Sequence, residues 1–121
     1  MNLSGSYLEF PMTCRIISCD DMACFIKSGD MIVVDARPST MFKRFRTVNS
    51  VIYKEFCTSA ENKTGLSGKK IVFVCSRGHK SLRLGSVFSK KYGIDTYSLE
   101  GGLTEFMRKH PDLMVMRSDS R

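Results

Sequence analysis

The chain has 121 residues, of which 42% are hydrophobic and 26% are charged, with a formal net charge of +7. This length fits one domain, and the composition is that of a globular protein rather than of a disordered one. The longest apolar runs, residues 31–34 and 71–75, are too short to span a bilayer, and the N-terminus lacks the basic segment of a secretory signal. We therefore expect a soluble single-domain protein with no membrane partner.

The positive charge and the cysteines narrow the choice of function. Lys and Arg number 19 against 12 Asp and Glu, which favours anionic partners, but without a long basic run we expect no specific nucleic-acid partner. The five cysteines have the spacing of neither a zinc site nor a disulfide framework. We expect a reducing compartment, the cytoplasm or the nucleus, and no metal or other cofactor.

The N-terminal part of the chain predicts one strand and one helix. Residues 1–13 have no firm period and form an irregular lead-in, and a short strand follows at 15–17. Ser18 is a suitable helix N-cap because two acidic residues follow in the first turn, and the turn residues 28–30 end the helix. Cys24 lies among the apolar residues of this helix, so we expect it in the core.

The middle of the chain predicts two strands and a short helix. Residues 31–34 form a continuous apolar strand of the kind that is buried on both faces. Pro38 begins a short helix that reaches toward Phe45, and a third strand covers 51–53. Residues 54–70 are polar and contain two glycines, which predicts a surface loop with at most one helical turn.

A fourth strand, at 71–74, leads directly into a polar and basic loop at 75–80, after which a helix begins. The apolar stripe of this helix contains Val87 between two other apolar residues at helical spacing, and Gly93 ends the helix after two lysines. A fifth strand follows at 94–99.

The C-terminal part of the chain completes the predicted fold. After the Gly101-Gly102 turn, a short helix carries Phe106 and stops before Pro111, and residues 116–121 form a frayed tail. Short buried strands that alternate with helices predict a small single-domain α/β fold over residues 14–115. Its parallel β-sheet of about five strands is flanked by helices on both faces.

Cys75 is the candidate catalytic residue, because it follows a buried strand and precedes a helix. Ligands of parallel α/β sheets bind beyond the carboxyl ends of the strands, and the N–H groups of a turn containing Gly78 form an anion cradle at the helix N-terminus. We expect the helix dipole and the cations Arg77 and Lys80 to lower the pKa of Cys75 and favour a nucleophilic thiolate. The residues expected to bind the substrate are Ser76, Arg77, Gly78, His79, Lys80 and Ser81.

Three neighbouring polar residues are expected to have other roles. Asp35 and Arg37 follow the strand at 31–34, and we expect them to brace its end by hydrogen bonds. His79, as a loop residue, is expected to point to solvent rather than to act as an acid or base.

Four segments resemble elements of the rhodanese family, in the family's order and over residues 15–113. They are Ile17-Ser18 with its acidic helix start, Val34-Asp35-Ala36-Arg37-Pro38, the loop Cys75-Ser76-Arg77-Gly78-His79-Lys80-Ser81 in place of Cys-x-x-Gly-x-Arg-Ser, and Leu99-Glu100-Gly101-Gly102 with Phe106. The resemblance implies a rhodanese-like fold and a thiosulfate-type sulfurtransferase. In that reaction the Cys75 thiolate takes sulfane sulfur from a small anionic donor, holds it as a persulfide and passes it to an acceptor, with a protein among the candidate acceptors.

The same fold also houses M-phase inducer phosphatases and arsenate reductases, which this chain resembles in part. Their loop is Cys-x5-Arg, whereas here the position of that Arg is Ser81, so the loop length favours sulfur transfer over attack on a phospho-substrate. A non-catalytic rhodanese-like binding module is the third alternative. It is open because Lys80 lacks the bidentate geometry of the family's Arg, and because residues 45–50 replace the family's Gly-His element.

Overall fold

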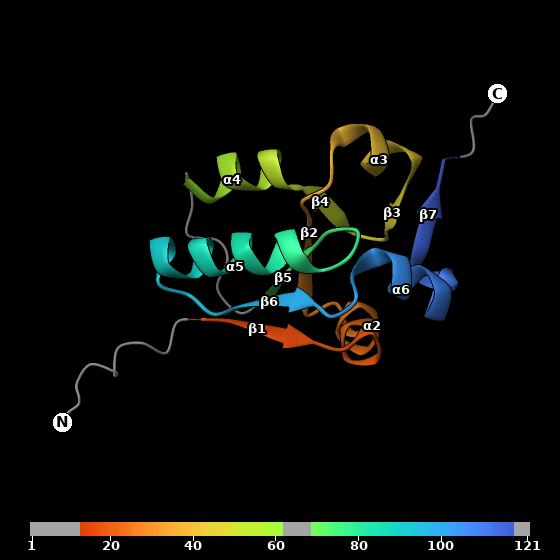
Figure 1. Ribbon diagram of the computed structural model, residues 1–121, viewed down its shortest axis with the longest axis horizontal. Coiled ribbons are helices and arrows are strands. Elements are labelled where there is room, and N and C mark those ends of the chain that lie inside the picture. Colours follow the sequence, from red (N-terminus) through yellow and green to blue (C-terminus); the bar gives the residue numbers. More distant parts are fainter. Residues whose placement is uncertain (1–12, 62–68, 118–121) are drawn as a thin grey trace.

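A computed structural model describes residues 13–61 and 69–117 of the chain. Apart from Thr13, Met116 and Arg117, the expected lead-in and the expected tail lie outside these residues. A five-stranded parallel sheet in the order β1-β6-β5-β2-β4 forms the centre of the molecule, which confirms the predicted α/β architecture (Figure 1). The strands are β1 (Cys14–Ile17), β2 (Met31–Asp35), β4 (Ser50–Ile52), β5 (Lys70–Val74) and β6 (Thr96–Leu99).

Helices cover both faces of this sheet, as predicted. One face packs against α2 and α6, which bury Met22 and Phe106, and the other packs against α4 and α5, which bury Phe56 and Phe88 (Figure 1). The four helices are α2 (Cys19–Ser28), α4 (Tyr53–Glu61), α5 (His79–Tyr92) and α6 (Gly102–Lys109).

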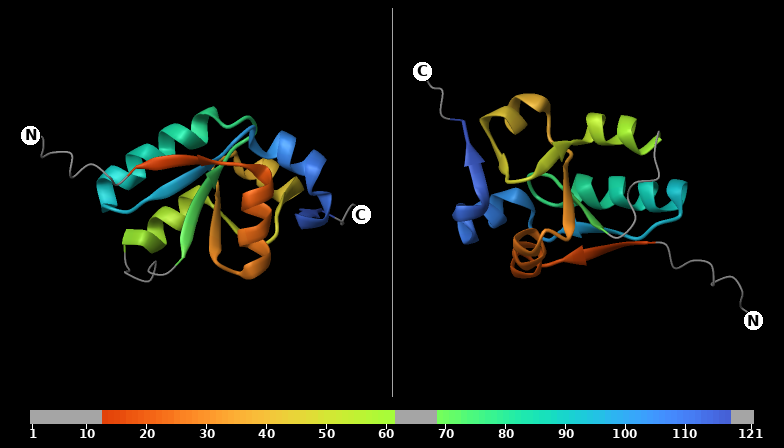
Figure 2. Two further views of the ribbon diagram at one scale, coloured as in Figure 1. Left: turned by 90° about the horizontal axis from the view of Figure 1, so that it is seen from below. Right: turned by 180° about the vertical axis from the view of Figure 1, so that it is seen from behind.

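A second, two-stranded sheet lies beside the main one and is absent from the predicted elements (Figure 2). The short helix α3 (Ser39–Arg44) leads into β3 (Phe45–Thr47), and the 3-10 helix η1 (Pro111–Leu113) leads into β7 (Met114–Met116). β3 and β7 pair in antiparallel fashion, with Phe45 opposite Met116. The expectation that Phe45 continues the preceding helix is therefore wrong, because pairing with a distant strand holds it extended.

The helix α2 begins as predicted but buries a different cysteine. The hydroxyl of Ser18 accepts a hydrogen bond from the N–H of Asp21 at 3.1 Å. The expectation that Cys24 lies in the core is wrong, since its side chain is exposed. The buried face consists of Cys19, Met22, Ala23 and Ile26, and Cys24 falls outside this spacing of three and four residues.

The helix α5 also turns a predicted core residue toward solvent. Val87 is 56% exposed, because the face of α5 nearest β6 is formed by the small buried residues Ser81, Gly85 and Ser89. Their size allows a close approach: a Cβ on Gly85 would lie 2.4 Å from the sulfur of Cys14 on β1.

The expectation that residues 54–70 form a surface loop with at most one helical turn is wrong for the first half of the segment. Residues 54–61 form most of the helix α4. Phe56 is 4% exposed, and its ring centroid lies 5.3 Å from that of Phe88 and 6.2 Å from that of Phe73. This aromatic contact with the core stabilises a helix that the polar composition does not indicate. Residues 62–68 of the segment lie outside the described residues.

Candidate functional site

The loop between β5 and α5 wraps around the sulfur of Cys75. This residue is 5% exposed and follows the last residue of β5, while α5 begins four residues later. Gly78 has φ +99°, a left-handed conformation that turns the chain back on itself and that favours glycine. As a result, the backbone N–H groups of Gly78 and Ser81 both donate to Cys75 Sγ at 3.2 Å.

Ser81 supports the same sulfur with its side chain. It is fully buried, and the thiol of Cys75 donates to Ser81 Oγ at 3.3 Å. When Cys75 loses its proton, the Ser81 hydroxyl is placed to donate to the thiolate instead. Sequence reasoning places Ser81 among the substrate-binding residues, and the structure shows it beneath the nucleophile rather than on the wall of the pocket.

The pKa of Cys75 is set by burial and hydrogen bonding. Burial alone raises the pKa, but the Ser81 hydroxyl and the N–H groups of Ser81, Gly78 and Lys80 together lower it below the usual value of a cysteine. The predicted direction therefore agrees with the structure, and so does the predicted contribution of the N–H groups at the start of the helix, whereas the expected contribution of the Arg77 and Lys80 side chains is not among the causes. Hydrogen bonds stabilise the thiolate, whereas the side chains of Arg77 and Lys80 are exposed.

A pocket of about 260 Å³ opens above this thiol. It joins the carboxyl ends of β2 and β5, which are neighbours in the sheet, and the N–H of Ala36 donates to the carbonyl oxygen of Val74 at 2.8 Å. Of the predicted site residues, Ser76, Arg77, His79 and Lys80 line the pocket with Cys75, and Gly78 does not. Its remaining lining residues are Ala36, Arg37 and Pro38. His79 and Lys80 have exposed side chains.

Asp35 and Arg37 brace the end of β2 beside the pocket, as the sequence predicts. Arg37 Nε and Nη2 donate to the Asp35 carboxylate at 3.0 and 2.8 Å, and both side chains are buried. The guanidinium also covers the ring of Phe45 at 4.5 Å from its centroid. This pair fixes the wall of the pocket that faces Cys75.

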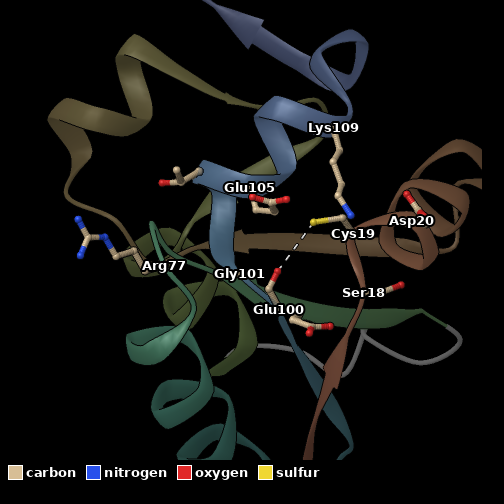
Figure 3. Close-up of a pocket in the computed structure, with 9 residues that line it drawn as sticks. Ser18, Cys19, Asp20, Arg77, Glu100, Gly101, Glu105 and Lys109 are labelled. Atoms are coloured by element: carbon tan, nitrogen blue, oxygen red, sulfur yellow. Dashed lines mark hydrogen bonds between the residues drawn. The ribbon is translucent and has the colours of Figure 1, made fainter.

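A second pocket, of about 530 Å³, lies between the N-terminus of α2 and α6 (Figure 3). Cys19 is one of its lining residues and donates to the carbonyl oxygen of Glu100 at 3.8 Å, and Lys109 extends toward Cys19. Burial raises the pKa of Cys19, whereas the pKa of Cys75 is lowered. Sequence reasoning missed this pocket because its lining comes from segments that are far apart in the chain, at 18–20, 77 and 100–109, and that only the fold brings together.

The part of the chain that the structure describes contains neither a metal-binding cluster nor a membrane-spanning helix. Within residues 13–61 and 69–117, no three His, Cys, Asp or Glu side chains are grouped so as to hold a metal ion. No helix among these residues is both long enough and apolar enough to cross a bilayer.

The comparisons with known proteins agree with this geometry. A family model described as a rhodanese-like domain matches residues 18–109. No curated protein sequence matches the chain.

Solved structures share the fold at low sequence identity. A rhodanese-related protein from Thermoplasma volcanium is 22% identical, with a TM-score of 0.64 over 78% of this chain and 92% of its own. A Saccharomyces cerevisiae homologue of single-domain rhodanese and the Cdc25 phosphatase catalytic domain is 11% identical, with a TM-score of 0.64 over 84% and 87%. A Rhodopseudomonas palustris protein of unknown function, described as a possible tyrosine phosphatase, is 18% identical, with a TM-score of 0.63 over 79% and 81%. These likenesses confirm the predicted rhodanese-like fold.

Proposed function

The chain belongs to the rhodanese-like domain family, and we propose that it is a thiosulfate-type sulfurtransferase that carries sulfane sulfur on Cys75. One observation carries this proposal: two N–H groups at 3.2 Å and a buried hydroxyl at 3.3 Å converge on Cys75 Sγ. Three donors around one sulfur stabilise a negative charge on it. The resulting thiolate lies at the base of a pocket that is open to a small anion.

The transfer runs in two displacements. The Cys75 thiolate attacks the outer sulfur of thiosulfate, the new S–S bond forms as the old one breaks, and sulfite leaves with the electron pair. A nucleophilic acceptor then attacks the outer sulfur of the persulfide, and Cys75 leaves as the thiolate that the loop stabilises. The exposed cations Arg77 and Lys80 at the pocket attract the anionic donor.

The size of the pocket and the state of the cysteines support proposals on the sulfur acceptor and on the cellular compartment. An opening of about 260 Å³ leaves room for a thiol at the end of a protein side chain, so we include a protein among the acceptors. All five cysteines are free, which fits a reducing compartment such as the cytoplasm or the nucleus.

Phosphoryl transfer by Cys75 is the second candidate function, since two of the structural relatives carry phosphatase descriptions. An aryl phosphate would need a cation that clamps two oxygens of the transferring group. Residue 81, where the phosphatase loop carries Arg, is a serine whose hydroxyl faces the thiol. Lys80 is exposed and lacks the planar fork of arginine. The site therefore fits sulfur transfer better.

A non-catalytic binding module is the remaining alternative. Such a module needs an anion cradle but has no need of a stabilised thiolate. The hydroxyl beneath Cys75 and the lowered pKa of its thiol argue for chemistry.

Intact mass measurement after incubation with thiosulfate tests the proposal. Wild type should gain one sulfur, and peptide mapping should place it on Cys75. The Cys75→Ser variant should gain none, while Cys24→Ser, which replaces an exposed thiol, should behave as wild type. Release of phenol from an aryl phosphate that depends on Cys75, without any sulfur gain, would establish the phosphatase instead. If wild type showed neither sulfur gain nor phenol release, the non-catalytic binding module would be the remaining function.

A further inference from the structure

The interface between α5 and β6 contains four buried hydroxyl side chains. Thr96 and Ser98 lie on the same face of β6, and Ser89 and Ser81 meet them from α5. The side-chain oxygens of Ser89 and Thr96 are 2.8 Å apart, and those of Ser81 and Ser98 are also 2.8 Å apart. The two pairs therefore stabilise the same interface by the same contact, and the Ser81–Ser98 pair in addition reaches the nucleophile.

The oxygen of Ser81 has three close neighbours. They are Cys75 Sγ at 3.3 Å, the carbonyl oxygen of Gly78 at 3.3 Å and Ser98 Oγ at 2.8 Å. A hydroxyl donates one hydrogen and accepts up to two. While Cys75 is a thiol, it donates to Ser81, and Ser81 donates to Gly78. Once Cys75 is a thiolate, the Ser81 hydrogen has to turn from Gly78 to the sulfur.

Ser98 determines how well Ser81 serves the thiolate. Among the residues that the structure describes, Ser81 is the hydrogen-bond partner of the Ser98 hydroxyl. Ser98 is 2% exposed, so water does not replace this contact. When Ser81 donates to Cys75, the Ser98 hydroxyl donates to Ser81, and a hydroxyl that accepts a hydrogen bond becomes a stronger donor.

We propose that Ser98 is a positioning residue, which orients the Ser81 hydroxyl so that it donates to the Cys75 thiolate. This inference rests on the proposed function only in taking Cys75 as the nucleophile. It adds Ser98 on β6, twenty-three positions along the chain from Cys75, which is not among the residues that line the pocket and whose hydroxyl is hydrogen-bonded to Ser81. Without the Ser98 hydroxyl, Ser81 loses the hydrogen bond that it accepts and becomes a weaker and less well oriented donor to the thiolate.

The charged groups around Cys75 do not depend on Ser98. Cys75 shares its pocket with cationic or titratable side chains from its own loop, from α5 and from the end of β2, and the carboxylate beside them is neutralised by an ion pair. These residues are Arg77, His79, Lys80 and Arg37, with Asp35 as the paired carboxylate. The acidic residues near α6, Glu100 and Glu105, line the other pocket. Within the described residues, no hydrogen bond joins Ser98 to any of them, so its substitution leaves the surrounding charge unchanged.

The test is the pH dependence of Cys75 alkylation by iodoacetamide in the full chain, followed by peptide mapping. Ser98→Ala should move the midpoint up by about half to one pH unit and slow the reaction at pH 7 by about three- to tenfold, the effect of one hydrogen bond. Ser89→Ala is the matched control, because it removes the equivalent hydroxyl from the same interface and should leave the midpoint unchanged. Ser98→Thr keeps the hydroxyl and should restore the wild-type midpoint.

A double variant shows whether Ser98 acts through Ser81. In a Ser81→Ala background, Ser98→Ala should add no further shift, because the residue through which it acts is gone. An unchanged midpoint in Ser98→Ala, an equal shift in Ser89→Ala, or full additivity in the double variant would overturn the proposal. Should Ser98→Ala fail to fold, Ser98→Cys replaces it in the test. The cysteine side chain is similar in size to serine and is a weaker hydrogen-bond donor, so the midpoint should again move up. Peptide mapping distinguishes alkylation of the introduced thiol from that of Cys75. If wild type formed no persulfide with thiosulfate, the proposed function would be rejected. The proposal for Ser98 would still be tested, because the alkylation of Cys75 does not require sulfur transfer.

Discussion

The N–H of Leu103 donates a 2.8 Å hydrogen bond to the carbonyl oxygen of Cys75, which ties the first turn of α6 to the nucleophile's own peptide. The N–H of Thr104 donates in the same way to Ser76 at 3.1 Å. Gly102 makes this approach feasible: its φ is +72°, and a Cβ there would lie 2.3 Å from the carbonyl oxygen of Ser76. Gly102 therefore allows α6 to pack directly against the active loop.

Gly102→Ala should consequently destabilise the fold and displace the loop. Left-handed strain and overpacking together should cost about 2–4 kcal/mol in the free energy of unfolding. Urea unfolding measures this loss. Gly93→Ala is the matched control, because Gly93 has φ +67° and no atom within 4 Å of its Cβ position, so strain alone should cost about 1–2 kcal/mol. Equal losses in the two variants would show that the contact with Ser76 is relaxed at no cost.

The cysteines should separate by their alkylation midpoints. The hydrogen bonds at Cys75 lower its pKa against the effect of burial, whereas burial raises the pKa of Cys19. The midpoint of Cys75 alkylation should therefore lie below the usual cysteine range and that of Cys19 above it. Rates measured against pH with peptide mapping give both values in one sample. A Cys75 midpoint at or above that of Cys19 would contradict the stabilised thiolate.

Folding stability should follow the same lowered pKa. A group whose pKa is lower in the folded state binds fewer protons there, so it adds stability as the pH rises above the folded pKa. This contribution is complete above the unfolded pKa and is lost as the pH falls through the folded one. The free energy of unfolding of wild type should thus rise relative to Cys75→Ser across that window. Parallel pH profiles for the two proteins would contradict the prediction.

The sequence predicts this site better than the faces of its helices. Cys75 and Gly78 could be placed because a strand, a turn glycine and a helix start are local signals. Cys24 and Val87 are exposed against expectation, because an apolar side chain on a helix points inward only where another element packs against that face, and this depends on residues far along the chain. No local pattern in the sequence indicates a role for Ser98. A serine within a strand acquires its role only when α5 folds back over it.

The buried pair of Asp35 and Arg37 should be the most sensitive ionic contact in the described part of the fold. Its side chains are 0% and 2% exposed at a separation of 2.8 Å. Asp35→Asn leaves a buried guanidinium without its counter-ion, which should cost about 3–5 kcal/mol in urea unfolding. Glu105→Gln, which breaks the exposed pair with Arg108, is the control and should cost nothing measurable. A small loss in Asp35→Asn would show that water reaches the guanidinium.

Lys80 offers a test of how the pocket attracts its donor. Its side chain is exposed at the edge of the pocket, while its backbone N–H supports the thiolate. Lys80→Ala should therefore keep the Cys75 alkylation midpoint and raise the KM for thiosulfate by about two- to fivefold, as expected for a solvent-exposed charge. Lys80→Arg restores the residue of the family loop and should preserve or improve transfer.

Salt dependence and a matched lysine separate attraction by Lys80 from a general effect of net charge. Exposed charges are screened within roughly 8 Å at physiological ionic strength, so the difference between wild type and Lys80→Ala should shrink as salt is added. Lys90→Ala removes the same charge from the last turn of α5, far from the pocket, and should leave the KM unchanged. A KM for Lys80→Ala equal to that of wild type at low salt would mean that Lys80 points away from the donor. An equal rise in Lys90→Ala would assign the attraction to the surplus of positive charge on the whole protein.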